Sequence, residues 1–135
     1  MSVRRRPSVN VLLDTHVFLW WDQQDTALSV HARDTINRPE NNIFISAATV
    51  WEIAIKCRTG KLVFEGVVID AVHDNGFHEL PILAADAEAA GDLEWQHADP
   101  FDRLLVAQAM RLGFILLTAD RSIRAFANVA QIWAG

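Results

Sequence analysis

Short hydrophobic runs recur along the chain, and the segments between them carry hydrophobic residues at helical spacing. The runs predict buried strands, and the spacing predicts helices that connect them. The predicted strands cover residues 9–13, 43–45, 77–82, 114–117 and 129–133, and Pro81 weakens the third of them. The predicted helices cover residues 16–21, 27–38, 47–59, 67–75, 84–93, 122–126 and a segment from Asp99 to Gly113.

Several predicted helices begin at residues that suit a helix start. Asp99 precedes a proline, which is a favoured combination of N-cap and first helical residue. Ser46 is a good N-cap for the helix at 47–59, and Thr15 can cap the turn after the first strand. On the helix at 84–93, we expect four acids to form a solvated face, namely Asp86, Glu88, Asp92 and Glu94.

The alternation of strands and helices predicts an α/β fold. Continuous hydrophobic strands are typical of a parallel sheet that helices cover on both faces. No repeat or linker divides the chain, so we expect residues 9–135 to form a single domain. Residues 1–8, which include Arg4, Arg5 and Arg6, are interpreted as a flexible basic extension, because the hydrophobic stretch behind them is too short for a signal peptide.

Composition narrows the possible environments and partners. The net charge of −5 argues against a broad basic surface that would bind nucleic acid by electrostatics alone. A single cysteine, Cys57, excludes an internal disulfide framework and zinc sites built on cysteine, and it fits a reducing cytoplasm. No segment is long and hydrophobic enough to span a membrane.

Four acids occupy positions where the predicted fold would bring them together. Asp14 and Asp120 follow the first and fourth strands, and the carboxyl ends of parallel strands lie at one edge of the sheet. Two helices carry Glu52 and Asp102, and their first turns should open onto the same edge. Each acid also has a structural interpretation: Asp14 and Asp120 as caps, and Asp102 as a partner of the helix dipole.

Clustered buried carboxylates require a positive partner. Glu52 lies in a hydrophobic helix, and an ion pair with Lys56 would contribute only about 0.2–0.5 kcal/mol. A divalent cation is therefore the stronger explanation, and a site made of carboxylates favours Mg²⁺ or Mn²⁺. The five histidines show no spacing typical of metal ligands, and His16 and His97 are interpreted as loop or capping residues.

Further polar residues lie beside these acids in the sequence. Arg103 is expected to orient a carboxylate, with contact to a phosphate as the alternative. The hydroxyls of Thr15, Ser46 and Thr118 are expected to support the acids, although all three also have capping interpretations. Asp99 is better explained as an N-cap than as a ligand.

Four sequence blocks resemble the signature motifs of PIN-domain ribonucleases, and in particular the VapC-like toxins of type II toxin–antitoxin systems. The blocks cover residues 12–16, 46–56, 97–109 and 117–120, in the order and spacing of the family. The most specific one reads Asp-Pro-Phe-Asp-Arg-Leu-Leu and starts at Asp99. The resemblance implies a PIN-like fold with a five-stranded, mostly parallel sheet flanked by helices.

The resemblance also implies an activity and partners. It implies an endoribonuclease that uses Mg²⁺ or Mn²⁺ and cuts RNA by means of Asp14, Glu52, Asp102 and Asp120, with Asp14 and Asp102 as the principal metal ligands. Proteins of this type are usually homodimers and are inhibited by a small cognate antitoxin that lies across the active cleft.

The sequence disfavours three other functions. A PIN-like module that binds RNA or a partner without cleaving has no need of four clustered acids. A phosphatase of the haloacid dehalogenase type generally has a second aspartate where this chain has His16. A dinucleotide-binding domain is excluded because no Gly-x-Gly-x-x-Gly motif follows a predicted strand.

Overall fold

A computed structural model of the protein describes residues 8–126 and 128–135, so Arg4, Arg5 and Arg6 of the predicted basic extension lie outside the described residues. Strands and helices alternate, as expected. In chain order they are β1 (Asn10–Leu13), α1 (Thr15–Asp22), α2 (Val30–Asn37), β2 (Asn42–Ser46), α3 (Ala47–Arg58), α4 (Val68–Asp74), β3 (His78–Leu80), α5 (Ala84–Asp92), α6 (Pro100–Leu112), β4 (Ile115–Thr118), α7 (Arg121–Ala125) and β5 (Gln131–Trp133).

The five strands form one parallel sheet in the order β3-β2-β1-β4-β5. β1 is the central strand, and Val11 lies opposite Ile43 of β2 on one side and Ile115 of β4 on the other. The predicted α/β class and all five predicted strands are confirmed. Because β1 and β4 are neighbours, the residues that follow them leave the sheet side by side at its carboxyl edge.

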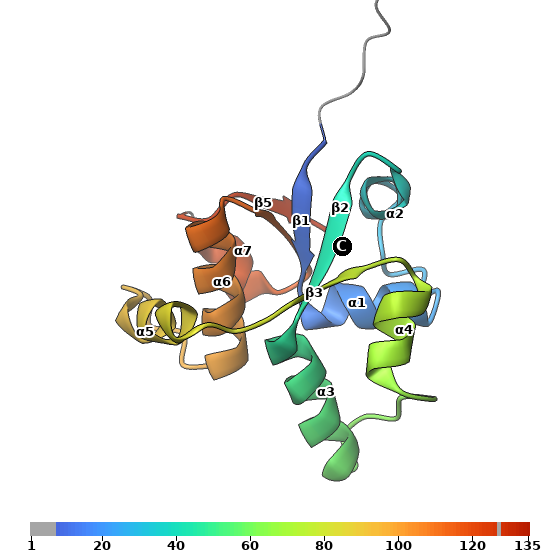
Figure 1. Cartoon of the computed structure of the whole chain (residues 1–135), viewed down its shortest axis with the longest axis horizontal. Helices are drawn as coiled ribbons and strands as arrows, with labels where there is room; N and C mark the ends of the chain where they lie inside the picture. Colours follow the sequence, from blue (N-terminus) through green and yellow to red (C-terminus); the bar gives the residue numbers. More distant parts are fainter. Residues whose placement is uncertain (1–7, 127) are drawn as a thin grey trace, which may run out of the picture.

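Side chains of the sheet alternate between two hydrophobic cores, one on each face. Val11 and Leu13 point into a core built with α1, α2, α3 and α4, whereas Leu12 points into a second core built with α6 and α7. Figure 1 shows α1, α2 and α4 on one side of the strands and α5, α6 and α7 on the other. Both faces are covered, which is why the strands read as continuous hydrophobic runs.

Two expectations about helix starts need correction. The cap of α1 is Asp14 and not Thr15: the Val17 amide donates to Asp14 Oδ1 at 2.8 Å. The second helix is shorter than the predicted 27–38, because Ser29 caps it and it runs from Val30 to Asn37. Ser46 and Asp99 cap α3 and α6 as predicted, and Gly113 ends α6 in the left-handed conformation.

The predicted solvated face of α5 is wrong for one of its four acids. Asp86 is fully buried and accepts hydrogen bonds from the Leu83 amide and from the Arg111 guanidinium of α6. These partners more than offset the burial of the carboxyl group and hold the pKa of Asp86 below its usual value. The sequence pattern of α5 did not reveal this ion pair because its partner lies on another helix.

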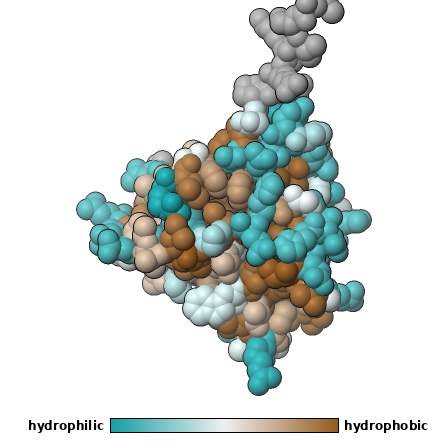
Figure 2. All heavy atoms as spheres, viewed as in Figure 1, coloured by the Kyte–Doolittle hydropathy of each residue, from teal (hydrophilic) through white to brown (hydrophobic). Residues whose placement is uncertain are grey.

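Hydrophobic side chains also reach the surface, and Figure 2 shows them in patches between hydrophilic residues. Trp51 on α3 is 56% exposed, whereas Trp20 and Trp21 pack against the core on the α1 side of the sheet. Cys57 packs against the same core. Within residues 8–126 and 128–135, no helix has the length and hydrophobicity to cross a membrane.

Candidate functional site

Hydrogen bonds from three groups fix the orientation of Asp14, one of the four predicted acids. It follows β1, is almost completely buried, and accepts hydrogen bonds from the Val17 amide at 2.8 Å, the Thr118 hydroxyl at 2.6 Å and the Ala119 amide at 2.9 Å. Burial raises its pKa, and the hydrogen bonds oppose that rise. The carboxylate therefore caps α1 and is held in one orientation at the carboxyl edge of the sheet.

Thr118 connects Asp14 to a second predicted acid. The Thr118 hydroxyl donates to Asp14 Oδ2 and accepts a hydrogen bond from the Asp120 amide at 3.0 Å. Asp120 caps α7 through its Oδ1, which accepts from the Ser122 and Ile123 amides. The capping interpretation of Asp120 is thus correct, but it involves only Oδ1. The Thr118 hydroxyl, which was predicted to support the acids, therefore contacts the Asp14 carboxylate and the backbone of Asp120.

Asp102 lies in the first turn of α6 and meets a histidine. His97 Nε2 lies 2.7 Å from Asp102 Oδ2. Burial, together with the negative charges of Asp99 and Asp120, raises the pKa of Asp102 to about 7, although the contact with His97 acts in the opposite direction. A carboxyl group with a pKa near physiological pH is only partly ionised, and a cation beside it lowers that pKa and favours the charged form.

One donor atom each from His97, Asp102 and Asp120 lies within 4.8 Å of the others. The two acids were predicted to lie together, whereas His97 was predicted to be a loop or capping residue. Histidine spacing along the chain did not reveal the group because a single histidine joins acids from two other segments. Its closeness in sequence to the Asp99–Asp102 motif is the signal that could have pointed to it.

Glu52 is buried as predicted, but protein groups contact both of its oxygens. The Thr15 hydroxyl donates to Oε1 at 2.7 Å, and Lys56 Nζ lies 2.8 Å from Oε2. Thr15 therefore supports Glu52, although it does not cap α1. The i,i+4 pair with Lys56 that the sequence offered is present, and it involves a glutamate residue that is only 7% exposed.

Three further predicted residues serve structural contacts. Asp99 caps α6 through bonds from the Phe101 and Asp102 amides. The Ser46 hydroxyl, which was expected to support an acid, instead donates to Gln108 Oε1 at 2.6 Å. Arg103, which was expected to orient a carboxylate, instead donates from its guanidinium to five backbone carbonyls, those of Ala90, Gly91, Leu93, Trp95 and His97.

The donor set at this edge suits a divalent cation. In the part of the chain that the structure describes, no lysine or arginine forms an ion pair with Asp14, Asp102 or Asp120. The groups close to one another are carboxylates and one imidazole, and two neighbouring carboxylates cannot both ionise without a cost in free energy. A bound cation would remove that cost.

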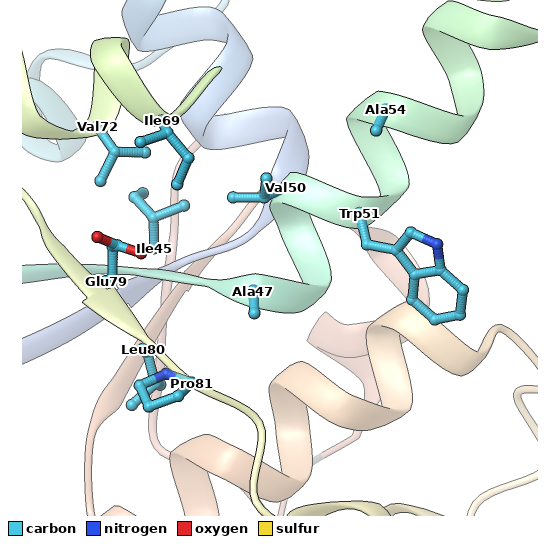
Figure 3. Close-up of a pocket in the computed structure, with 10 residues that line it drawn as sticks. All are labelled: Ile45, Ala47, Val50, Trp51, Ala54, Ile69, Val72, Glu79, Leu80 and Pro81. Atoms are coloured by element: carbon cyan, nitrogen blue, oxygen red, sulfur yellow. The ribbon is translucent and has the colours of Figure 1, made fainter. Parts of the chain in front are cut away.

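A hydrophobic hollow of about 510 Å³ lies elsewhere, between α3, α4 and β3. Figure 3 shows Ile45, Val50, Ile69 and Val72 around it, with Glu79 the single charged residue in this lining. None of the four acids borders the hollow. Its chemistry suits a nonpolar ligand or side chain, and the chemistry of ion binding belongs to the carboxyl edge of the sheet.

Comparison with protein-family models adds a decisive finding. The model described as the PIN domain matches residues 11–130, which include every acid discussed above. The chain belongs to the PIN domain family. In this PIN domain, the matched region begins in β1 and ends just before β5, so the family model covers the sheet edge and the helices around it.

Individual relatives agree with this membership. The PIN domain is 27% identical over 117 residues to Ribonuclease VapC22 of Mycobacterium tuberculosis, which corresponds to 84% of this chain and 89% of the relative.

Two solved structures share the fold. One is VapBC2 from Rickettsia felis bound to a promoter DNA fragment, with a TM-score of 0.67, 14% identity, and coverage of 92% of this chain and 98% of that chain. The other is FitAcB from Neisseria gonorrhoeae, with a TM-score of 0.64, 18% identity, and coverage of 91% and 96%.

Proposed function

We propose that this protein is a metal-dependent endoribonuclease and the toxin of a toxin–antitoxin pair. The observation that carries the proposal is the group of acids at the carboxyl edge of β1 and β4, where Asp14, Asp102 and Asp120 have no lysine or arginine partner in the described part of the chain. Membership of the PIN domain family and the likeness to a protein named Ribonuclease VapC22 support it.

The proposed ligands of the cation are Asp14, Glu52, Asp102 and Asp120, with Asp14 and Asp102 as the principal ones. The cation is Mg²⁺ or Mn²⁺, because carboxylate oxygens are the ligands that these hard ions prefer. When bound, such a cation polarises the phosphate and lowers the pKa of the attacking water. Thr118 keeps Asp14 oriented through its 2.6 Å hydrogen bond, so this carboxylate needs little reorganisation.

Glu52 and Asp120 are proposed to position the water that attacks phosphorus. Glu52 is held by Thr15 on one oxygen and by Lys56 on the other, so it offers a fixed acceptor on the α3 side. Asp120 uses Oδ1 to cap α7, which leaves Oδ2 for the site. Rigid acceptors on two sides of a phosphate favour attack along one line.

The test is cleavage of a structured RNA panel by the purified protein, with Mg²⁺ or Mn²⁺ and then with excess EDTA. We expect cleavage only with the metal, and a loss of at least about 100-fold in D14N and D102N because each removes a charge that holds the ion. D34N is the matched control, since Asp34 is exposed on α2. Equal cleavage by D14N, D102N and D34N, with or without EDTA, rejects the proposal; RNA binding without cleavage favours a non-catalytic module.

The biological setting is proposed on the same grounds. Proteins that share the fold include VapBC2 from Rickettsia felis and a toxin–antitoxin complex from Klebsiella pneumoniae, and we propose a small cognate antitoxin as the partner of this chain. A homodimer in the cytoplasm and a single domain over residues 9–135 complete the proposal. Co-expression with the product of a short adjacent gene should abolish RNA cleavage and give one complex in size-exclusion chromatography; unchanged cleavage by the mixture contradicts the pairing.

A further inference from the structure

His97 lies in the segment between α5 and α6, and its ring faces the acids of the site. Its Nε2 atom is 2.7 Å from Asp102 Oδ2, and one of its ring nitrogens lies within 4.8 Å of a carboxylate oxygen of Asp120. The His97 side chain is 26% exposed, so the ring is neither buried in the core nor free in solvent.

The segment that carries His97 is held by specific contacts. The Arg103 guanidinium donates to the carbonyl of His97 itself at 3.1 Å and to that of Trp95 at 2.6 Å. The Trp95 ring packs between two others, with its centroid 4.8 Å from that of His97 and 5.0 Å from that of Phe126. Backbone and ring are thus both positioned, which is typical of a residue whose side chain must point at a defined place.

We infer that His97 Nε2 is a direct ligand of the divalent cation in this site, together with Asp102 and Asp120. The inference rests on the proposed function. Ligands about 2.0–2.1 Å from an octahedral ion are about 3 Å apart when adjacent and about 4 Å apart when opposite. The 2.7 Å between His97 and Asp102, and the 4.8 Å limit for all three donors, require only small movements to match these separations.

Ion entry also has a simple proton balance. The hydrogen bond between Nε2 and Oδ2 contains one proton, which must leave before Nε2 can bind an ion. If Nδ1 also carries a proton, the first one goes to solvent as the cation binds. If the ring is neutral with its proton on Nε2, that proton is lost and one is taken up at Nδ1, so the bound imidazole is neutral in both cases. The nitrogen lone pair and the carboxylate charge then both face the ion.

A nitrogen ligand has a consequence for metal choice. Mg²⁺ binds almost entirely through oxygen, whereas imidazole is a good ligand for transition-metal ions. His97 should therefore favour Mn²⁺ over Mg²⁺ in this site. If His97 only oriented Asp102 through a hydrogen bond, its removal would weaken the binding of both ions to the same degree.

The experiment measures bound Mn²⁺ by electron paramagnetic resonance on the full chain, without RNA. Pulsed spectra detect the ¹⁴N nucleus of an imidazole bonded directly to Mn²⁺, and titration gives the affinity. The variant is H97Q, whose amide can still donate to Asp102. The matched control is H16Q, because His16 is exposed on α1 and lies close enough to influence the charge of Asp14.

We expect ¹⁴N coupling in the wild type and in H16Q, and no coupling in H97Q. In H97Q the Mn²⁺ affinity should fall by at least about tenfold, and the Mg²⁺ affinity, measured by competition, by less than about threefold. Bound Mn²⁺ without ¹⁴N coupling in the wild type, or coupling that is lost in H16Q and kept in H97Q, overturns the inference and leaves the nuclease proposal intact.

Absence of any Mn²⁺ or Mg²⁺ binding by the wild type would remove the proposed function together with the inference, so the two failures differ. Circular dichroism establishes whether each variant is folded. If H97Q does not fold, wild-type protein with ¹⁵N-labelled histidine provides the decision: the coupling must change to that of ¹⁵N in both the wild type and H16Q. Unchanged ¹⁴N coupling in the labelled protein contradicts a histidine ligand.

Discussion

Neutralising Asp102 should stabilise the protein in the absence of metal. The folded state raises the pKa of this carboxyl from 3.8 to about 7, chiefly because the group is buried beside Asp99 and Asp120. The folded state therefore prefers the neutral form. Below about pH 4 the carboxyl is protonated in both folded and unfolded chains and costs nothing. Between about pH 4 and 7 the unfolded chain loses this proton while the folded protein keeps it, so the cost grows with pH and levels off above about 7.

The size of this effect follows from the pKa difference. A difference between 3.8 and about 7 corresponds to about 4 kcal/mol at pH 8. The Asp102 side chain is partly exposed and contacts His97, so solvent screening reduces the expected value to about 2 kcal/mol. D102N keeps the shape and the hydrogen-bond acceptor for His97 but carries no charge, and should therefore be more stable than the wild type by about that amount.

The assay is urea denaturation in EDTA at pH 4, 6 and 8, followed by tryptophan fluorescence. The stability advantage of D102N should be small at pH 4 and grow up to pH 8. D34N, which changes an exposed acid of α2, should show no such trend. The reasoning is refuted if D102N is less stable than the wild type at pH 8, or if its advantage is the same at all three pH values.

Three other substitutions test structural contacts in the same assay. R103K removes the planar group that bonds five carbonyls and should lower the free energy of unfolding by about 2–3 kcal/mol, whereas R58K at an exposed site of α3 should change little. G113A forces a side chain onto a residue at φ 67° and should cost about 1 kcal/mol; an unchanged midpoint contradicts this. D86N should destabilise at pH 7, and the difference should narrow below pH 3.8, because the lowered pKa of Asp86 contributes stability only where that carboxyl is charged; a constant difference rejects this explanation.

The sequence by itself determined where the strands and several helix starts lie and which acids follow the strands. Short hydrophobic runs located β1 and β4, and local caps located the starts of α3 and α6, because these signals depend on residues a few positions apart. Asp14 and Asp120 were predicted to lie at one sheet edge from the rule for parallel strands alone. In the structure, the Thr118 hydroxyl connects them by hydrogen bonds to the Asp14 carboxylate and from the Asp120 amide.

The Lys56–Glu52 pair is an i,i+4 contact within α3, which the sequence already offered. Only the tertiary structure decided two other partners: Arg111 of α6 reaches the buried Asp86 of α5, and His97 reaches Asp102. His97 and Asp102 are near in sequence, yet their side chains meet only because of how the segment before α6 packs at the sheet edge. Side-chain contacts depend on helix orientation and on the order of strands in the sheet, neither of which a local pattern encodes. The choice of nitrogen or oxygen around a cation is therefore a property of the folded chain.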